Sequence, residues 1–250
     1  MRFNFKEKFN KLLDNIFVND FKCIVCGKEI LRNSRYSMCK DCLAKLPYIK
    51  KSCEKCGESI VSGNLCLNCK RELPKITQNF SVFDYSKPIN YLITNLKYDN
   101  KKYIANYLSN FLVDKFIESN IKVDFVIPVP ISENRLKIRG FNQAELLCSA
   151  FNEKLNMEVC PNLVSRIVDT ISQTSLSRKE RLTNLTNTFK VNDKNKIKGK
   201  SILIVDDVYT TGATINEIAK VLFKAKAKNV YGLTVAHSVN NVLMEETLKE

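Results

Sequence analysis

Length, composition and charge restrict the class of this protein before any motif is considered. The chain has 250 residues, 44% of them hydrophobic, and its 40 Lys and Arg against 26 Asp and Glu give a formal net charge of +14. That length suits one large core or two smaller ones. No apolar run approaches the roughly 18 residues that a membrane-spanning helix needs, and the N-terminus lacks the apolar core of a signal peptide. We therefore expect a soluble, cytoplasmic protein without a membrane span.

The first residues predict an amphipathic helix over 5–17. Its apolar positions recur at three-to-four spacing, with lysines on the other faces: Phe5, Phe9, Leu12, Leu13, Ile16 and Phe17. We expect this helix to pack on the cysteine-rich segment that follows. A membrane-surface or partner-binding helix is the alternative, because a basic face beside an aromatic stripe also suits an interface.

Eight of the ten cysteines form four Cys-x-x-Cys knuckles: Cys23/Cys26, Cys39/Cys42, Cys53/Cys56 and Cys66/Cys69. Two knuckles together supply the four thiolates of a structural zinc site. We therefore predict two structural zinc ions, with no catalytic role, that fold a segment too small for a core of its own. Four copies without thioredoxin-like flanks disfavour a redox function. The spacing leaves open whether adjacent or alternate knuckles share an ion. Cys148 and Cys160 sit among apolar residues, and we assign them no function.

Pro74 marks a boundary between this segment and a region of alternating helix and strand patterns, so we predict domains at 1–75 and 76–250. The expected strands are 80–85, 123–129, 163–168, 202–208 and 230–236, and the expected helices are 89–97, 103–116, 142–155 and 213–226. Such alternation predicts an α/β fold, a mostly parallel doubly wound sheet, preceded by a small zinc-ribbon domain.

The most informative segment follows the strand at 202–205, whose uninterrupted apolar residues are typical of a strand buried on both faces. Asp206 and Asp207 come next, at the sheet's carboxyl edge, where open α/β folds bind ligands. Carboxylates there suit sugar hydroxyls or magnesium. The turn that follows offers backbone N–H groups, hydroxyls and a glycine at a helix start, which favours a phosphate: Thr210, Thr211, Gly212, Ala213 and Thr214. Acids beside a phosphate turn imply a sugar phosphate; the alternative is a capping loop with solvated acids.

Other loops at the same edge carry positive charge. Arg135 and Arg139 precede the helix at 142, and arginine pairs bidentately with phosphoryl oxygens; surface solvation or a salt bridge to Glu133 or Glu145 is the alternative. The polar stretch 173–184 could close over an anion, with Arg181 supplying charge, or form a surface helix and turn.

Three further residues have competing interpretations. Tyr98 or Phe141 could stack on a base, although aromatic residues beside helices are more often core. His237 favours a structural role over that of a general base.

The net charge suggests a second activity. Two four-thiolate zinc sites would each add 2 − 4 = −2, lowering +14 to about +10, so the chain stays basic. Clusters such as Lys50-Lys51, Lys70-Arg71 and the lysines at 194, 196, 198 and 200 could neutralise phosphates of single-stranded DNA. Taken singly, each cluster is more typical of a solvated loop.

The acid pair and the turn resemble the ribose-phosphate signature of the type I phosphoribosyltransferases, which bind 5-phosphoribosyl-1-pyrophosphate (PRPP). The resemblance implies that Asp206 and Asp207 hold the ribose 2′ and 3′ hydroxyls, that residues 210–214 wrap the 5′-phosphate, and that magnesium bridges PRPP's own oxygens. Arg135 and Arg181 would be the catalytic charges, and Arg135 and Arg139 the pyrophosphate contacts.

From Cys23 to about Val235, the chain resembles the ComF-type competence proteins. The marks are the four knuckles, Leu96-Lys97-Tyr98, Arg135 with residues 139–145, Gln173 with Leu176, Arg181 and Asn184, and residues 205–214. The family implies a role in natural transformation, where imported single-stranded DNA is handled beside a translocation ATPase. A nucleotide-salvage phosphoribosyltransferase acting on a free base and a non-catalytic zinc-ribbon adaptor are the alternatives.

Overall fold

The computed structural model describes residues 22–30, 35–98, 101–167 and 188–238, and the chain forms two compact units, Met1–Leu46 and Pro47–Glu250. This division differs from the predicted boundary at residue 75. The reason is that the second set of knuckle cysteines packs with the sheet: Cys53, Cys56 and Cys69 share a buried cluster with Ile76 and Tyr209. The predicted helix at 5–17 and the stretch at 173–184 lie outside the described residues.

The smaller unit holds the first two knuckles. Gly27 directly follows the second cysteine of its knuckle and adopts φ +74°, a left-handed conformation that glycine reaches without strain. Helix α2 (Lys40–Ala44) begins after Cys39, so the second knuckle spans the start of a helix.

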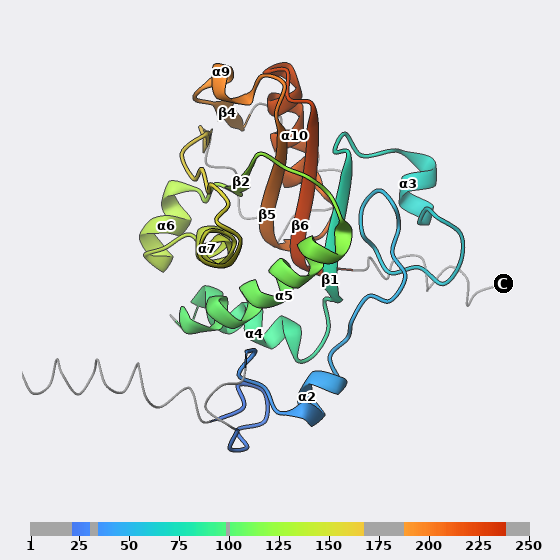
Figure 1. The fold of residues 1–250 in the computed structure, drawn as a ribbon, viewed down its shortest axis with the longest axis vertical. Helices are drawn as coiled ribbons and strands as arrows, with labels where there is room; N and C mark the ends of the chain where they lie inside the picture. The colour runs from blue at the N-terminus through green and yellow to red at the C-terminus, as the bar shows by residue number, and fades with distance from the viewer. Residues whose placement is uncertain (1–21, 31–34, 99–100, 168–187, 239–250) are drawn as a thin grey trace, which may run out of the picture. The chain divides into compact units, whose positions relative to one another are not determined.

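The larger unit is built on a four-stranded parallel sheet of order β1-β6-β5-β2 (Figure 1). Its strands are β1 (Gln78–Asp84), β2 (Phe125–Pro128), β5 (Ser201–Tyr209) and β6 (Asn229–His237). Each lies within about two residues of a predicted strand at both ends. The parallel sheet is therefore confirmed, with the strand that carries the acid pair at its centre.

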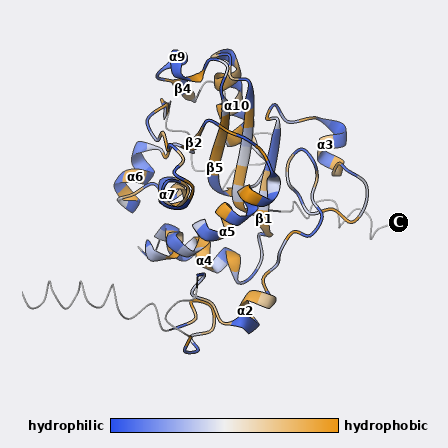
Figure 2. Ribbon diagram, in the orientation of Figure 1, coloured by the Kyte–Doolittle hydropathy of each residue, from blue (hydrophilic) through white to orange (hydrophobic). Residues whose placement is uncertain are grey.

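Helices cover both faces of this sheet (Figure 1). On one side pack α5 (Tyr103–Ser119) and α7 (Gln143–Leu155), and on the other α10 (Ala213–Lys224). Side chains of β5 alternate between the two: Ile202 and Ile204 belong to the cluster that includes Ile218 and Leu222 of α10, so the residues between them face α5 and α7. Figure 2 shows hydrophobic residues along β5 and α10, as a strand buried on both faces requires.

The remaining elements are short or lie at the rim. They are α3 (Leu67–Arg71), α4 (Ile89–Tyr98), α6 (Glu133–Arg139), α9 (Lys194–Ile197) and an antiparallel pair, β3 (Val164–Arg166) with β4 (Phe189–Val191). The sequence analysis treats 131–139 as a loop, and the structure corrects this. Ser132 caps α6, since its Oγ accepts a hydrogen bond from the Arg135 N–H at 3.4 Å, and Gly140 ends the helix at φ +74°.

Across the described part of the chain, we find no helix with the length and apolar character needed to cross a membrane.

Candidate functional site

The acid pair lies at the carboxyl edge of the sheet, as predicted. Asp206 and Asp207 are both buried near the end of β5. Asp206 Oδ1 accepts a hydrogen bond from the Asp207 backbone N–H at 2.8 Å, which fixes one carboxyl relative to the other. Two adjacent buried carboxyl groups cannot both ionise cheaply, because each charge is desolvated and repels the other.

Lys97, near the end of α4, resolves this conflict by forming an ion pair with Asp207. Burial alone would raise the pKa of Asp207, but the Lys97 ammonium holds it below its usual range. Burial and the neighbouring Asp207 charge raise the pKa of Asp206 well above its usual range. The site thus holds one carboxylate, one carboxyl group that favours its proton, and a cation that a ligand could engage.

The turn after β5 forms a shallow hollow at the start of α10. The hollow is lined by Asp206 and by residues 208–215. Gly212 adopts φ +73°, and the Thr211 Oγ1 accepts a hydrogen bond from the Ala213 N–H at 3.4 Å. The turn therefore presents backbone N–H groups and threonine hydroxyls beside the acid pair, the arrangement that suits a phosphate.

The ring of Tyr209 supports this turn from below. A Cβ added at Gly212 would lie 2.0 Å from the Tyr209 hydroxyl, so only glycine fits above the ring. The ring is buried and stacks on His237, with 5.0 Å between ring centroids. Burial lowers the pKa of His237 to about 4, so the imidazole is neutral at pH 7. The support role favours the structural interpretation of His237.

Of the two predicted arginines, the described contacts bring one toward the acid pair. Arg139 donates to Gln143 Oε1 at 2.9 Å and to the Tyr98 hydroxyl at 3.3 Å, and its charge helps lower the pKa of Asp207. Arg135 lies in the first turn of the same helix and is half-buried, but no described contact joins its side chain to the acids. Arg181 lies outside the described residues.

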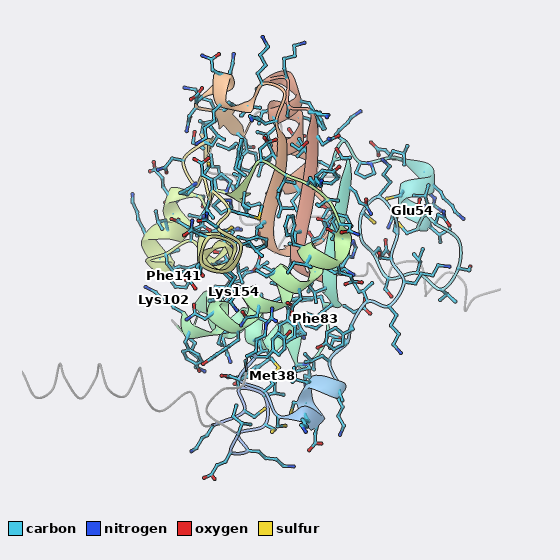
Figure 3. The ribbon with its side chains drawn as sticks, in the orientation of Figure 1. Met38, Glu54, Phe83, Lys102, Phe141 and Lys154 are labelled. Atoms are coloured by element: carbon cyan, nitrogen blue, oxygen red, sulfur yellow. The ribbon has the colours of Figure 1, made fainter. Side chains whose placement is uncertain are left out.

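The predictions for the aromatic residues divide. Tyr98 is 64% exposed, with the Arg139 guanidinium 5.1 Å from its ring centre, so it is available for stacking. Phe141 is buried, and the Lys102 ammonium lies 4.9 Å from its ring centre (Figure 3), so it belongs to the core.

Lys97 is the residue that sequence reasoning left without a role. It belongs to the Leu96-Lys97-Tyr98 mark, but only the fold places it against Asp207. Its available signal was a single lysine in the last turn of an otherwise apolar helix.

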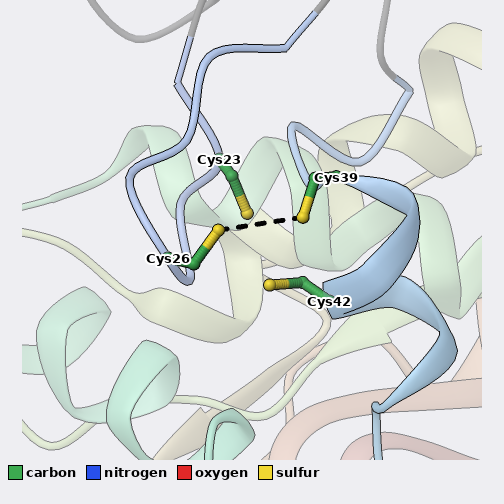
Figure 4. A group of neighbouring side chains, drawn as sticks. All are labelled: Cys23, Cys26, Cys39 and Cys42. Carbon is green, nitrogen blue, oxygen red and sulfur yellow. Dashed lines mark hydrogen bonds between the residues drawn. The ribbon is translucent and has the colours of Figure 1, made fainter.

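The cysteines form two groups of four, each made from adjacent knuckles. One is Cys23, Cys26, Cys39 and Cys42 (Figure 4), and the other is Cys53, Cys56, Cys66 and Cys69; within each group the sulfur atoms lie within 4.8 Å of one another. This settles the pairing that the spacing left open. Burial would raise the pKa of Cys23, but hydrogen bonds from the backbone of Cys39, Cys26 and Val25 bring it down to about 6. Both groups fit a tetrahedral zinc ion with no free coordination position.

Two of the lysines proposed to contact DNA are already paired within the protein. Lys196 forms an ion pair with Glu158, and Lys200 forms one with Asp124 at 2.9 Å. Cys148 and Cys160 are buried, as expected for core residues without a function.

Comparisons with known proteins agree with this geometry. Residues 148–242 match the family described as phosphoribosyl transferase domain, and residues 12–70 match the double zinc ribbon domain. With the parallel sheet and the two four-cysteine groups, these matches define the class: a type I phosphoribosyltransferase fold preceded by a double zinc ribbon.

Relatives then identify the family. Competence protein F of Haemophilus influenzae is 32% identical over 87% of this chain and 98% of its own. DNA utilization protein YhgH of Escherichia coli K12 is 31% identical over 83% and 93%, and competence protein ComFC of Streptococcus pneumoniae is 30% identical over 84% and 96%. The chain belongs to this ComF family of competence and DNA-utilization proteins. Among solved structures, an adenine phosphoribosyltransferase aligns over 59% of this chain and 77% of its own, at 18% identity and a TM-score of 0.37.

Proposed function

We propose that this protein binds PRPP with magnesium at the carboxyl edge of β5 and binds single-stranded DNA, in a cytoplasmic competence role beside a translocation ATPase. One observation carries the PRPP part: two buried acids directly precede a turn whose only tolerated residue at its left-handed position is glycine. The names of the relatives, competence and DNA utilization, support the cellular role.

Each residue of the site would have a separate task. Asp206 and Asp207 would accept hydrogen bonds from the ribose hydroxyls, and the turn at 210–214 would donate to the 5′-phosphate. Lys97 and Arg139 would supply positive charge for the pyrophosphate, with Arg135 as a further predicted contact. Magnesium, when bound with PRPP, supplies charge neutralisation by bridging the ligand's own oxygens.

Phosphoribosyl transfer, if it follows binding, would break the C1–O bond to pyrophosphate through an oxocarbenium-like state. Such a state needs charge stabilisation and positioning more than a strong base. The buried acids, Lys97 and the predicted charge of Arg181 are suited to that requirement.

Titration calorimetry with PRPP and magnesium tests the site. We expect heat with the wild type and a loss of affinity of at least about tenfold in Asp206→Asn and in Asp207→Asn, since hydrogen bonds to charged groups are worth roughly 1.5–3 kcal/mol. Glu153→Gln, an exposed change on α7, is the control and should bind as the wild type does. No heat with the wild type would refute PRPP binding and favour the zinc-ribbon adaptor.

A panel of free bases with PRPP and magnesium separates binding from salvage. Rapid release of pyrophosphate with one base would favour the nucleotide-salvage alternative. Silence across the panel, together with calorimetric binding, would support a family member whose acceptor is not a free base.

Single-stranded DNA binding is tested by its salt dependence. We expect log affinity to fall against log salt with a slope near −0.7 per phosphate neutralised. Residues 1–46 carry 10 Lys and Arg against 5 Asp and Glu, a formal +5, or about +3 with one zinc site. Deleting this compact unit, which leaves the second knuckles in place, should weaken binding and flatten the slope. Unchanged affinity would move the DNA site to the larger unit.

A further inference from the structure

A cavity of about 260 Å³ separates the second zinc knuckles from the phosphate turn, within the larger unit. One wall comes from the knuckle segment and includes Glu58, Cys69 and Glu72. The other comes from the turn and α10 and includes Thr211 and Asn216, with His237 at the end of β6. A space of this size lies just below the roughly 300–1,000 Å³ of drug-sized ligand pockets, so it suits a smaller molecule such as a single heterocycle.

The cavity is continuous with the phosphate turn. Tyr209, Thr210, Thr211 and Ala213 line both the cavity and the hollow beside Asp206. A molecule in the cavity would therefore lie next to whatever sugar phosphate the turn holds.

Hydrogen bonds across the walls make this space a fixed feature of the fold. Asn216 Oδ1 accepts from the Lys75 and Ile76 backbone N–H groups, at 2.9 and 3.3 Å, which ties α10 to the segment after the knuckles. Asn79 of β1 donates to the Cys56 carbonyl at 3.0 Å. At Gly57 a side chain would lie 2.8 Å from the Asn79 carbonyl oxygen, so the knuckle approaches the sheet as closely as glycine allows.

The charges that face the cavity are mainly negative. Glu58, Glu72 and Glu217 outnumber Lys75 and Lys220, and Lys220 is already paired with Glu217. Zinc held by four thiolates carries 2 − 4 = −2, and two of its ligands, Cys56 and Cys69, line the wall. This environment repels carboxylates and phosphates and attracts neutral or cationic groups that donate hydrogen bonds.

Two acceptors in the cavity have unmet hydrogen-bonding capacity. Both ring nitrogens of His237 are buried and lack a hydrogen-bond partner among the described residues. The described donors to Glu58 are the thiols of Cys56 and Cys66, and zinc ligation would remove both protons. Buried acceptors without donors cost free energy, so a ligand with N–H groups would be stabilised here.

We propose that this cavity binds the amino-bearing face of a nucleobase of the cytosine or adenine type, with Glu58 and His237 accepting its N–H groups. The proposal rests on the proposed PRPP function and adds to it the chemical class of the second ligand. It excludes acidic heterocycles, which the negative wall would repel, and it gives the second zinc knuckle a role as a wall of the binding site.

Matched pairs of bases test the class of ligand, because cytosine and uracil, or adenine and hypoxanthine, differ by an amino group in place of a carbonyl. Equilibrium binding to the full-length, zinc-loaded protein is measured with saturating PRPP and magnesium. We expect the amino-bearing member of each pair to bind at least about tenfold tighter. Equal affinities, or tighter binding of uracil and hypoxanthine, would overturn the proposal.

A charge-neutral variant tests the assigned residue. In Glu58→Gln, the new amide can donate as well as accept, so the preference for cytosine over uracil should shrink by about tenfold. Glu153→Gln, with the same chemistry on an exposed face of α7, should leave the ratio unchanged. Zinc content and the unfolding midpoint confirm that both variants are folded. A ratio that stays the same in Glu58→Gln would contradict the role of that carboxylate.

The base could arrive free or within a strand of DNA. Tetranucleotides of deoxycytidine and deoxyuridine distinguish the two sources: discrimination only among oligonucleotides points to DNA, and discrimination only among free bases points to a small molecule. Lack of binding by every base and oligonucleotide would refute the proposal. Calorimetry with PRPP alone reports separately on the proposed function, so PRPP binding without base discrimination would reject only the cavity's role.

Discussion

Replacing Gly212 by alanine should damage the phosphate turn through a clash that can be worked out from the structure. The residue has φ +73°, a conformation that costs an L-residue about 1–2 kcal/mol. The added Cβ would also lie 2.0 Å from the Tyr209 hydroxyl and 2.3 Å from its Cζ. Because Tyr209 is buried and stacked on His237, its ring cannot swing away without disturbing that pair, which adds about 1–3 kcal/mol of overpacking.

Gly199→Ala is the matched control. Gly199 has φ +74°, but an added Cβ would meet no atom within 4 Å. In denaturant unfolding, we expect Gly199→Ala to lower the free energy of unfolding by about 1–2 kcal/mol and Gly212→Ala by about 2–5 kcal/mol. PRPP affinity should fall only in Gly212→Ala, since only that change displaces the turn.

A double variant isolates the clash. Tyr209→Leu removes the ring that the new methyl group would meet, so Gly212→Ala should cost less in that background than in the wild type. Equal destabilisation by the two glycine variants, together with an additive double variant, would refute the assigned support of the turn by Tyr209.

Three further outcomes follow from the charges and the thiols. Asp207→Asn should lower the free energy of unfolding at pH 7, because it leaves Lys97 unpaired; Lys97 depresses the pKa of Asp207, so the deficit should persist above about pH 3.9 and vanish as the pH falls through the lowered value, as read from urea denaturation against pH. Asp206→Asn should behave in the opposite way: burial raises the pKa of Asp206, so the wild type loses stability as the pH rises through that value and the variant gains relative to it, while PRPP binding is lost. Cys56→Ser should release one zinc ion and lower the unfolding midpoint of the larger unit, whereas Cys26→Ser should release one ion without that shift, measured by zinc content and thermal melting; equal melting of both variants would contradict the shared core of the second knuckles.

Local patterns in the sequence were sufficient for much of the site. The apolar run at 202–205, the two acids and the glycine turn are contiguous, so their strand, edge and helix start follow from side-chain pattern and backbone preference within a dozen residues. The four knuckles likewise define four-thiolate zinc sites by spacing alone. The loop at 131–139 was wrong because a serine cap and a terminal glycine make a short helix there, a weak signal against the expected phosphate loop.

Tertiary packing decided what depends on segments distant in the chain. The sequence determined that this protein has an acid pair, a phosphate turn and two sets of zinc ligands, because each is written within one short stretch whose conformation is local. Only the folded structure placed Lys97 against Asp207, which drives the pKa values of two neighbouring acids apart. It also joined adjacent knuckles and set the second pair beside Tyr209 and His237. These relations arise from burial and from charges brought together across the sheet, and no local pattern records them.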